Sequence, residues 1–420
     1  AQGRAGGGRN SVDVDSTGAA RADGDRLLAD DDSGTRDDEV LRELDLIDVW
    51  FDSGSMPYAQ WHYPFENQEK FKQNFPADFI AEGVDQTRGW FFTLHAIATM
   101  AFDSVAFKNV VSNGLVQDKV GMKMSKRLGN AVEPFSTLAE HGADATRWYM
   151  ISNAPPWENL KFNIEGIKEV QRKFFGTLYN TYSFFALYAN IDNFQMGAQD
   201  MIPMADRPEI DRWIMSRLNS MIKEVTAAYE DYEPTQACRA IDSFVQDQLS
   251  NWYVRLCRRR FWKGEMSADK QAAYETLYEC LVVVSQLMSP VAPFFSDWLY
   301  RNLTEQTRAN AKAAGVDALD SIHLTILAPA NEDFIDQALE QRMDYAQRIS
   351  SLGLSLRKNA KIRVRQPLKK ILLPVLDENF RTQVEAVKPL ILAELNLKDI
   401  EYLDDTSGFL KKKIKPNFKT

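Results

Sequence analysis

A helical pattern of apolar residues runs through the middle of this chain, starting near Ile164. Apolar side chains recur at three- and four-residue spacing in residues 209–232, 234–262 and 270–303. This spacing puts them on one face of each segment, and such a face is stable only when it is buried against a neighbour. The pattern predicts an all-α bundle across residues 165–320.

The segment before the bundle alternates between short apolar runs and helical stretches. "FPADFIAEG" (75–83) and "KNVVSNGLVQD" (108–118) are typical of strands, and the second contains Asn113-Gly114, a turn signal. "DQTRGWFFTLHAIATMAF" (85–102) is typical of a helix that Asp85 can cap, with Trp90, Leu94 and Ile97 on one face. With a further helix at "ADATRWYMIS", the order indicates a parallel α/β domain over residues 41–164.

The pattern becomes mixed again near Ile322. "KIRVRQPLKKILLPVL" (361–376) alternates as a strand does, and its flanks are helical. We therefore expect a small α/β module to start in residues 321–420. The predicted fold class of the whole chain is α/β plus all-α.

Residues 1–40 differ from the rest of the chain. Gly, Ala, Arg and Asp fill 27 of these 40 positions, and no lysine or aromatic residue occurs there. Such a segment cannot bury a core, so we expect it to be disordered. Two interpretations are open: a flexible acidic tail, or a segment foreign to the gene.

Composition narrows the possible classes of protein. No run of 18 apolar residues occurs, so no membrane span is expected. The first residues contain no apolar h-region, so no secretory signal is expected either. The three cysteines are far apart, which favours neither a disulfide framework nor a zinc site. A cytoplasmic protein without a metal site is predicted. The net charge of −9 does not exclude RNA binding, because binding depends on local basic clusters.

The loop "VGMKMSKRLGN" (120–130) crowds Lys123 and Lys126 around Ser125, between two glycines. Glycine lets backbone approach a ligand, and lysine is a compact charge on a flexible stem. The loop is therefore suited to close over a triphosphate and to stabilise charge as pyrophosphate leaves. The alternative is a solvated basic surface loop.

This loop resembles the KMSKS motif of class I aminoacyl-tRNA synthetases, with Arg127 at the usual place of the last serine. "DVWFDSGSMPYAQWHYPFEN", the segment from Phe75 to Phe102 and "NVVSNGLVQDKVGMKMSKRLGN" resemble the isoleucyl-tRNA synthetases. The resemblance covers residues 44–420 and is most specific from Val49 to Asn130. "KIRVRQPL" is similar to the eukaryote-like branch of that family, which some bacteria also use.

The resemblance implies a fold and a set of functional residues. The fold would be the C-terminal half of a Rossmann-like catalytic domain, followed by an anticodon-binding bundle. Lys126, supported by Lys123, would stabilise the transition state of ATP-dependent isoleucine activation, and both would bind ATP with Ser125. The residues implied for the amino acid or its adenylate are Glu82, Gly83, Asp85, Gln86, Trp50 and Trp90. For each tryptophan the alternative is ordinary core packing.

The chain also departs from the family. The second ATP-binding motif, His-Ile-Gly-His, does not occur, because no two of the four histidines have its spacing. The editing insertion that precedes "VWFDSG" in the family does not occur either. We therefore expect a fragment that lacks the N-terminal half and is inactive alone.

Two basic clusters are candidates for binding tRNA(Ile). The first is Arg255, Arg258, Arg259 and Lys263, beside two tryptophans, and the second lies between residues 357 and 370 and includes Arg363 and Arg365. Phosphate contacts would dominate affinity and aromatic stacking would help to read bases. The alternatives are a solvated helix face or internal salt bridges.

The predicted function is that of an isoleucine–tRNA ligase fragment. Its partners would be isoleucine, tRNA(Ile) and ATP accompanied by Mg2+, and we expect a monomer. Two alternatives are a non-catalytic tRNA-binding protein and a valine-specific relative. The preserved lysine loop argues against a pure RNA binder.

Overall fold

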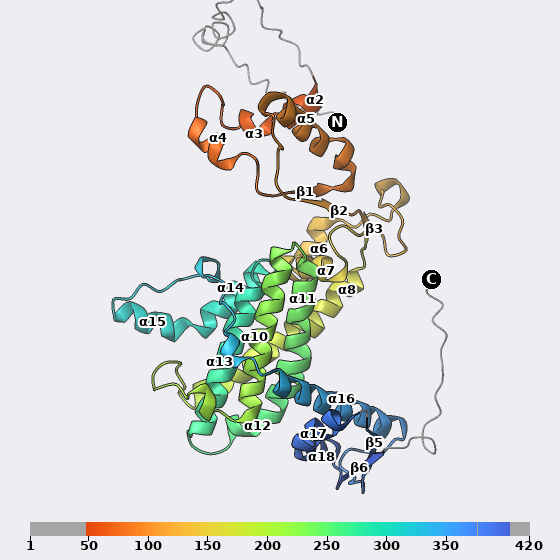
Figure 1. Cartoon of the computed structure of the whole chain (residues 1–420), viewed down its shortest axis with the longest axis vertical. Coiled ribbons are helices and arrows are strands. Elements are labelled where there is room, and N and C mark those ends of the chain that lie inside the picture. The colour runs from red at the N-terminus through yellow and green to blue at the C-terminus, as the bar shows by residue number, and fades with distance from the viewer. Residues whose placement is uncertain (1–47, 376, 404–420) are drawn as a thin grey trace, which may run out of the picture. The chain divides into compact units, whose positions relative to one another are not determined.

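A computed structural model describes residues 48–375 and 377–403 (Figure 1). These residues form two compact units. The first holds residues 48–80 and 85–110, and the second holds residues 81–84 and 111–403. The predicted tail, residues 1–40, lies outside the described residues.

Short helices and a small core make up the first unit. Leu94, Ala98 and Ala106 are its buried apolar cluster. The carboxylate of Asp48 accepts the N–H groups of Trp50 and Phe51 at 2.8 and 3.1 Å, so the apolar run that follows it begins as a capped helix. The helices are α2 (Val49–Gly54), α3 (Met56–Ala59), α4 (Gln68–Asn74) and α5 (Trp90–Phe102).

The helix predicted from residue 85 begins at Trp90 instead. Residues Val84–Arg88 form a 3-10 turn, so Asp85 does not cap the helix as expected. The side chain of Gln86 takes this part, because its Oε1 accepts the N–H of Trp90 at 3.0 Å. Leu94 and Ile97 are buried, which confirms the predicted apolar face.

The strands in this part of the chain pair two by two, and one of them, Leu160–Lys161, lies outside the predicted strand segments. β1 (Ile80–Gly83) pairs with β2 (Val110–Asn113), and β3 (Val116–Gln117) pairs in parallel with β4 (Leu160–Lys161). Gly114 stands between β2 and β3, but these two strands do not form a hairpin. A Cβ at Gly114 would lie 2.2 Å from the carbonyl oxygen of Glu158, so close backbone approach requires this glycine.

Helices dominate the second unit, as the apolar spacing predicted (Figure 1). Residues 234–262 form one uninterrupted helical run, in which a π-helical segment, Phe244–Val254, joins α11 to α12. Residues 270–303 are split, because Pro293 begins a new helix. The helices are α6 (Pro134–His141), α7 (Ala143–Asn153), α8 (Ile164–Val170), α9 (Gly176–Ile191), α10 (Glu209–Glu230), α11 (Pro234–Ser243), α12 (Arg255–Trp262), α13 (Ala268–Met288), α14 (Pro293–Leu303) and α15 (Glu305–Ala313).

One large apolar core runs through the bundle. Its fully buried side chains include Trp148, Trp213 and Tyr274. The three cysteines lie inside it, and burial raises the pKa of Cys238 and of Cys257 to about 12 and the pKa of Cys280 well above its usual value. Among the described residues, no helix combines the length and the apolar character that crossing a membrane requires.

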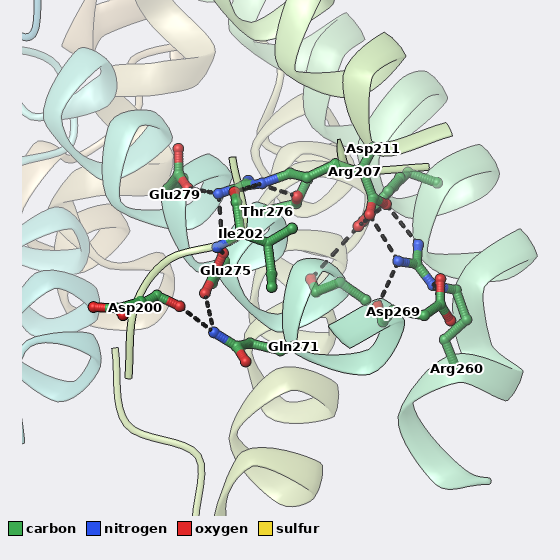
Figure 2. A network of polar contacts seen from close by, with 12 residues as sticks. Asp200, Ile202, Arg207, Asp211, Arg260, Asp269, Gln271, Glu275, Thr276 and Glu279 are labelled. Atoms are coloured by element: carbon green, nitrogen blue, oxygen red, sulfur yellow. Dashed lines mark hydrogen bonds and ion pairs between the residues drawn. The ribbon is translucent and has the colours of Figure 1, made fainter. Parts of the chain in front are cut away.

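A polar network ties the start of α10 to α12 and α13 (Figure 2). The carboxylate of Asp211 accepts two guanidinium N–H groups of Arg260, at 2.6 and 2.7 Å, and the hydroxyl of Tyr253 at 2.8 Å. Arg207 donates to Glu275 and Glu279 at 3.1 and 3.0 Å. Asp211, Arg207 and Glu275 are almost fully buried, and burial is tolerated because each charge is paired.

The C-terminal part of the second unit is a small α/β arrangement. It holds α16 (Gln337–Asn359), β5 (Ile371–Pro374), α17 (Glu378–Ala386), α18 (Lys388–Leu395) and β6 (Ile400–Leu403), with β5 and β6 parallel. The strand predicted over residues 361–376 is confirmed only at Ile371–Pro374. The residues before it form a loop, since Lys361 has a φ of 56° and Pro367 lacks a backbone donor.

Candidate functional site

Four residues meet at the start of α5, within the first unit. The indole Nε1 of Trp90 donates to the carbonyl oxygen of Ser53 at 3.2 Å, which ties α5 to α2. A Cβ added to Gly89 would lie 3.0 Å from the Trp50 ring and 2.8 Å from the Gln86 Oε1. Gly89 therefore leaves the space in which Trp50, Gln86 and Trp90 come together.

The two tryptophans differ in how much of each side chain is exposed, which bears on whether each packs in the core or is free to contact a ligand. Trp90 is half-buried and packs against the small core of the first unit, so structural packing explains part of its surface. Trp50 is 46% exposed. An indole that lies against a glycine with half its surface open offers a flat apolar wall for a ligand.

The other residues predicted for the amino acid lie at the end of β1 and in the turn after it. Glu82 is exposed and Gly83 is half-buried; both close β1 in the second unit. Asp85 is exposed in the 3-10 turn of the first unit, and its Oδ2 accepts the side-chain amide of Gln86 at 3.4 Å. The part of Glu82, Gly83 and Asp85 in binding stays a prediction.

The lysine loop lies between β3 and α6. Lys123 and Lys126 are exposed, and neither has an ion-pair partner among the described residues. Ser125 caps a single 3-10 turn, Lys126–Leu128, because its Oγ accepts the N–H of Arg127 at 3.2 Å. Met124, between the two lysines, is partly buried and packs against the large apolar core. The loop thus has an apolar anchor and two free ammonium groups.

Two residues that the sequence did not single out hold this loop. The carboxylate of Asp118 accepts the N–H groups of Val120 and Met122 at 3.0 and 2.8 Å. The side-chain amide of Asn130 donates to Asp118 at 2.9 Å, and its oxygen accepts the N–H of Ser125 at 2.9 Å. The hydrogen bond from Asn130, followed by that from Met122, lowers the pKa of the Asp118 carboxyl. In the sequence, the only sign of this role is that Asp118 and Asn130 stand at the two ends of the lysine loop.

The first basic cluster is only partly free. Arg258, Arg259 and Lys263 are exposed on and just after α12, as predicted. Arg255 is exposed too, but its guanidinium lies over the Trp252 ring and forms an ion pair with Glu394 of α18, with 2.5 Å between Nη1 and Oε2. For Arg255 the structure thus shows an internal salt bridge, one of the two alternatives to RNA binding.

The second basic cluster is organised around a buried arginine. Arg357 is 4% exposed and donates to the carbonyl oxygens of Arg363, Gln366, Leu395 and Asn396, at distances from 2.7 to 3.2 Å. It therefore does not face solvent with the rest of its cluster. Arg363 and Arg365 are exposed, as predicted.

The two basic clusters meet at the C-terminal end of α18. Glu394 holds Arg255 from α12, and the next two residues, Leu395 and Asn396, hold Arg357 from α16. Clusters that are more than 90 positions apart in the sequence thus converge on three consecutive residues. The exposed members without an ion pair among the described residues are Arg258, Arg259, Lys263, Lys358, Lys361, Arg363, Arg365 and Lys369.

Two protein families match successive parts of the chain. Residues 7–163 match the model of class I tRNA synthetases for isoleucine, leucine, methionine and valine. Residues 211–372 match the model of the anticodon-binding domain of tRNA ligases. The protein class is therefore a class I synthetase catalytic segment followed by an anticodon-binding domain.

Individual relatives narrow the class. The chain is 61% identical over 395 residues to the isoleucine–tRNA ligase of Cytophaga hutchinsonii, which covers 94% of this chain and 35% of that protein. It is 60% identical to the isoleucine–tRNA ligase of Bacteroides thetaiotaomicron, a match that covers 90% of this chain and 32% of that protein. It is 43% identical to the isoleucine–tRNA ligase of Thermus thermophilus, a match that covers 89% of this chain and 35% of that protein. The chain belongs to the isoleucyl-tRNA synthetase family. It spans about a third of the length of these relatives.

Solved structures share the fold at low sequence identity. A leucyl-tRNA synthetase of Agrobacterium radiobacter K84, in a ternary complex with tRNA, matches with a TM-score of 0.51 at 21% identity, over 70% of this chain and 35% of that one. The methionyl-tRNA synthetase of Mycobacterium tuberculosis, in complex with methionyl-adenylate, matches with a TM-score of 0.52 at 20% identity. This match covers 68% of this chain and 55% of that one. These likenesses support the fold class alone.

Proposed function

We propose that this chain is a segment of an isoleucine–tRNA ligase, which activates isoleucine with ATP and transfers it to tRNA(Ile). The observation that carries the proposal is the loop with Lys123 and Lys126 exposed on either side of Ser125, in a chain about 60% identical to such ligases. A carboxylate oxygen of isoleucine attacks the α-phosphorus of ATP, and pyrophosphate leaves. The ammonium groups meet negative charge that grows on the departing phosphates.

The amino-acid part of the site follows from two tryptophans, one on α2 and one on α5. Trp50 and Trp90 provide flat apolar walls that suit a branched aliphatic side chain; Gly89 leaves room for the Trp50 ring, and Gln86 accepts the N–H of Trp90. Glu82, Gly83 and Asp85 supply polar groups for the ammonium group or the adenylate.

Magnesium belongs to the proposal as a companion of the ATP phosphates, and hence as part of the substrate. Among the described residues, no group of three or more His, Cys, Asp or Glu side chains could hold a metal ion. In the proposed reaction the phosphates of ATP supply ligands to Mg2+, and Lys123 and Lys126 approach the same phosphates from the protein.

The RNA part of the function rests on the exposed basic residues at the end of α18. Arg258, Arg259, Lys263, Arg363 and Arg365 contact phosphates of tRNA(Ile), which set affinity and orientation rather than sequence preference. Arg255 acts through its ion pair with Glu394, which joins α12 to α18. The proposal further includes a ligase that acts as a cytoplasmic monomer and belongs to the eukaryote-like branch of the family.

Exchange of pyrophosphate into ATP tests the proposal. A full-length enzyme carrying this segment should catalyse the exchange with isoleucine far better than with valine. Trp90→Ala should raise the isoleucine requirement and weaken that discrimination, which rests on one methylene and for which isoleucyl-tRNA synthetase is itself the well-known example, at about 150-fold. Glu82→Ala should impair both binding and rate. This chain alone should give no exchange.

Two results would redirect the assignment. Preference for valine would make the enzyme the valine-specific relative. Tight tRNA binding without any amino-acid activation by the full-length enzyme would favour the non-catalytic RNA-binding protein.

A further inference from the structure

The loop that carries the two lysines is closed on itself by side chains at its two ends. The amide nitrogen of Asn130 donates to the Asp118 carboxylate at 2.9 Å and to the carbonyl oxygen of Lys123 at 3.2 Å. The amide oxygen of Asn130 accepts the N–H of Ser125 at 2.9 Å. One side chain thus joins the start, the middle and the end of the loop.

Asp118 organises the first half of the same loop. Besides its side-chain bonds to Val120 and Met122, its own N–H donates to the carbonyl oxygen of Met122 at 2.9 Å. Gly121 and Gly129 have φ values of 91° and 65°, a region that residues with a Cβ rarely occupy, so the turns on both sides of the lysines depend on glycine. We call the Asp118–Asn130 pair, with these hydrogen bonds, the clamp.

The clamp acts on backbone and leaves the ammonium groups free. Lys123 and Lys126 are exposed, and every contact of the clamp in this stretch goes to a main-chain N–H or carbonyl group. Ordering a slack loop at the moment of reaction would cost conformational entropy for each residue that is fixed. A loop that is already ordered avoids that cost, and the binding energy of its lysines can be used on the transition state.

We infer that Asp118 and Asn130 are positioning residues for isoleucine activation, because they hold the backbone of residues 122–125 in the conformation that presents Lys123 and Lys126 to the leaving pyrophosphate. The inference rests on the function proposed above for the lysine loop. It assigns no contact between the clamp and substrate: both side chains act through the lysines.

Amide hydrogen exchange on this chain tests the clamp without any activity. In Asn130→Ala, Ser125 loses its acceptor directly, whereas Met122 keeps its bond to Asp118. If the clamp is one unit, the amides of both residues should exchange about 10-fold faster or more. Glu133→Gln is the matched control, because Glu133 caps the next helix through Ser136 and should leave both loop amides unchanged. Unchanged α10 amides would show that the fold is intact. Faster exchange at Ser125 alone would overturn the inference.

Pre-steady-state adenylate formation by the full-length enzyme tests the link to chemistry. Asn130→Ala should lower the rate of adenylate formation about 10- to 100-fold, the usual effect of losing a hydrogen bond to a charged group, with isoleucine binding unchanged. Asn130→Asp should be worse, since two carboxylates would face each other, and adding Asp118→Asn should recover part of the loss. A double variant no better than Asn130→Asp, or a loss confined to isoleucine binding, would overturn the positioning role.

The two measurements test the clamp and the proposed function independently of each other. A wild-type full-length enzyme that forms no isoleucyl-adenylate would overturn the proposed function and the catalytic half of this inference. The exchange rates of this chain would still decide for or against the clamp.

Discussion

The lysine loop, residues 118–130, and the arginine loop, residues 360–370 after α16, are both basic loop segments, but they are held in opposite ways. The lysine loop is closed by an acid and an amide within it, Asp118 and Asn130. The arginine loop contains no acid. It is held by Arg357, in the last turn of α16, whose guanidinium donates hydrogen bonds to carbonyl oxygens of the loop and of the end of α18.

This difference shows what each loop is built to do. An internal carboxylate offsets part of the charge of the lysine loop and lets it keep its shape when no anion is bound. In and beside the arginine loop, Arg357 is buried and Lys370 pairs with Glu401, whereas Lys358, Lys361, Arg363 and Arg365 have no ion pair among the described residues. The positive charges of such a loop are not neutralised within the protein, so they remain available to attract a long polyanion.

The largest effect should come from the lysine loop. In the full-length enzyme, Lys126→Ala should lower the rate of adenylate formation about 100- to 1000-fold, because the ammonium group interacts best with charge that develops in the transition state. Arg127→Ser is the matched control: it removes a neighbouring charge and restores the residue usual in the motif, so it should change the rate little. If Lys126→Ala raised only the isoleucine requirement, the loop would be a substrate-binding surface.

The next effect concerns the stability of the arginine loop. Arg357→Met should lower the free energy of unfolding by about 1–3 kcal/mol, since it leaves buried carbonyl groups without a donor. Arg365→Met removes the same charge from an exposed position and should leave stability unchanged. Chemical denaturation of both variants makes the comparison. Equal stabilities would mean that Arg357 does not hold the loop.

A smaller effect is expected on RNA binding. Arg363→Ala and Arg365→Ala should each reduce the slope of log affinity against log salt by about 1, with affinity reduced for all RNA sequences alike. Lys312 on α15 pairs with Asp320, so Lys312→Ala serves as the control, for which the slope should not change. Titration of tRNA at several salt concentrations gives the slopes. A loss for one RNA sequence only would identify base recognition instead of phosphate contact.

The smallest effect is the pH dependence of the clamp. Hydrogen bonds lower the pKa of Asp118 in the folded state, so its carboxylate stabilises the fold at pH values above the usual 3.8, and this contribution is lost as pH falls through the lowered pKa. Asp118→Asn should therefore be less stable than wild type near neutral pH, and the difference should shrink in acid. Thermal unfolding at a series of pH values measures it. A constant difference would mean that charge plays no part.

Local patterns made the helices of the second unit and the lysine loop predictable, because apolar spacing and motif are properties of neighbouring residues. The part played by Arg357 was not, because the seven basic residues from position 357 to 370 look alike in the sequence. The carbonyl oxygens that distinguish Arg357 include those of Leu395 and Asn396, 38 and 39 positions further on. The strand expected from residue 361 failed for a similar reason. Alternation reveals neither the positive φ of Lys361 nor the loop carbonyl groups that accept hydrogen bonds from Arg357. The clamp likewise depends on partners 12 positions apart.

The buried cysteines have a practical consequence for following the loops in solution. Cys238, Cys257 and Cys280 are enclosed in the bundle, and their raised pKa values keep the thiols protonated at neutral pH. A thiol must be both accessible and ionised to react with a maleimide. A cysteine introduced at exposed Met122 or Val364 would therefore react selectively with a fluorophore. Single-site labelling would not require replacing the three buried cysteines first.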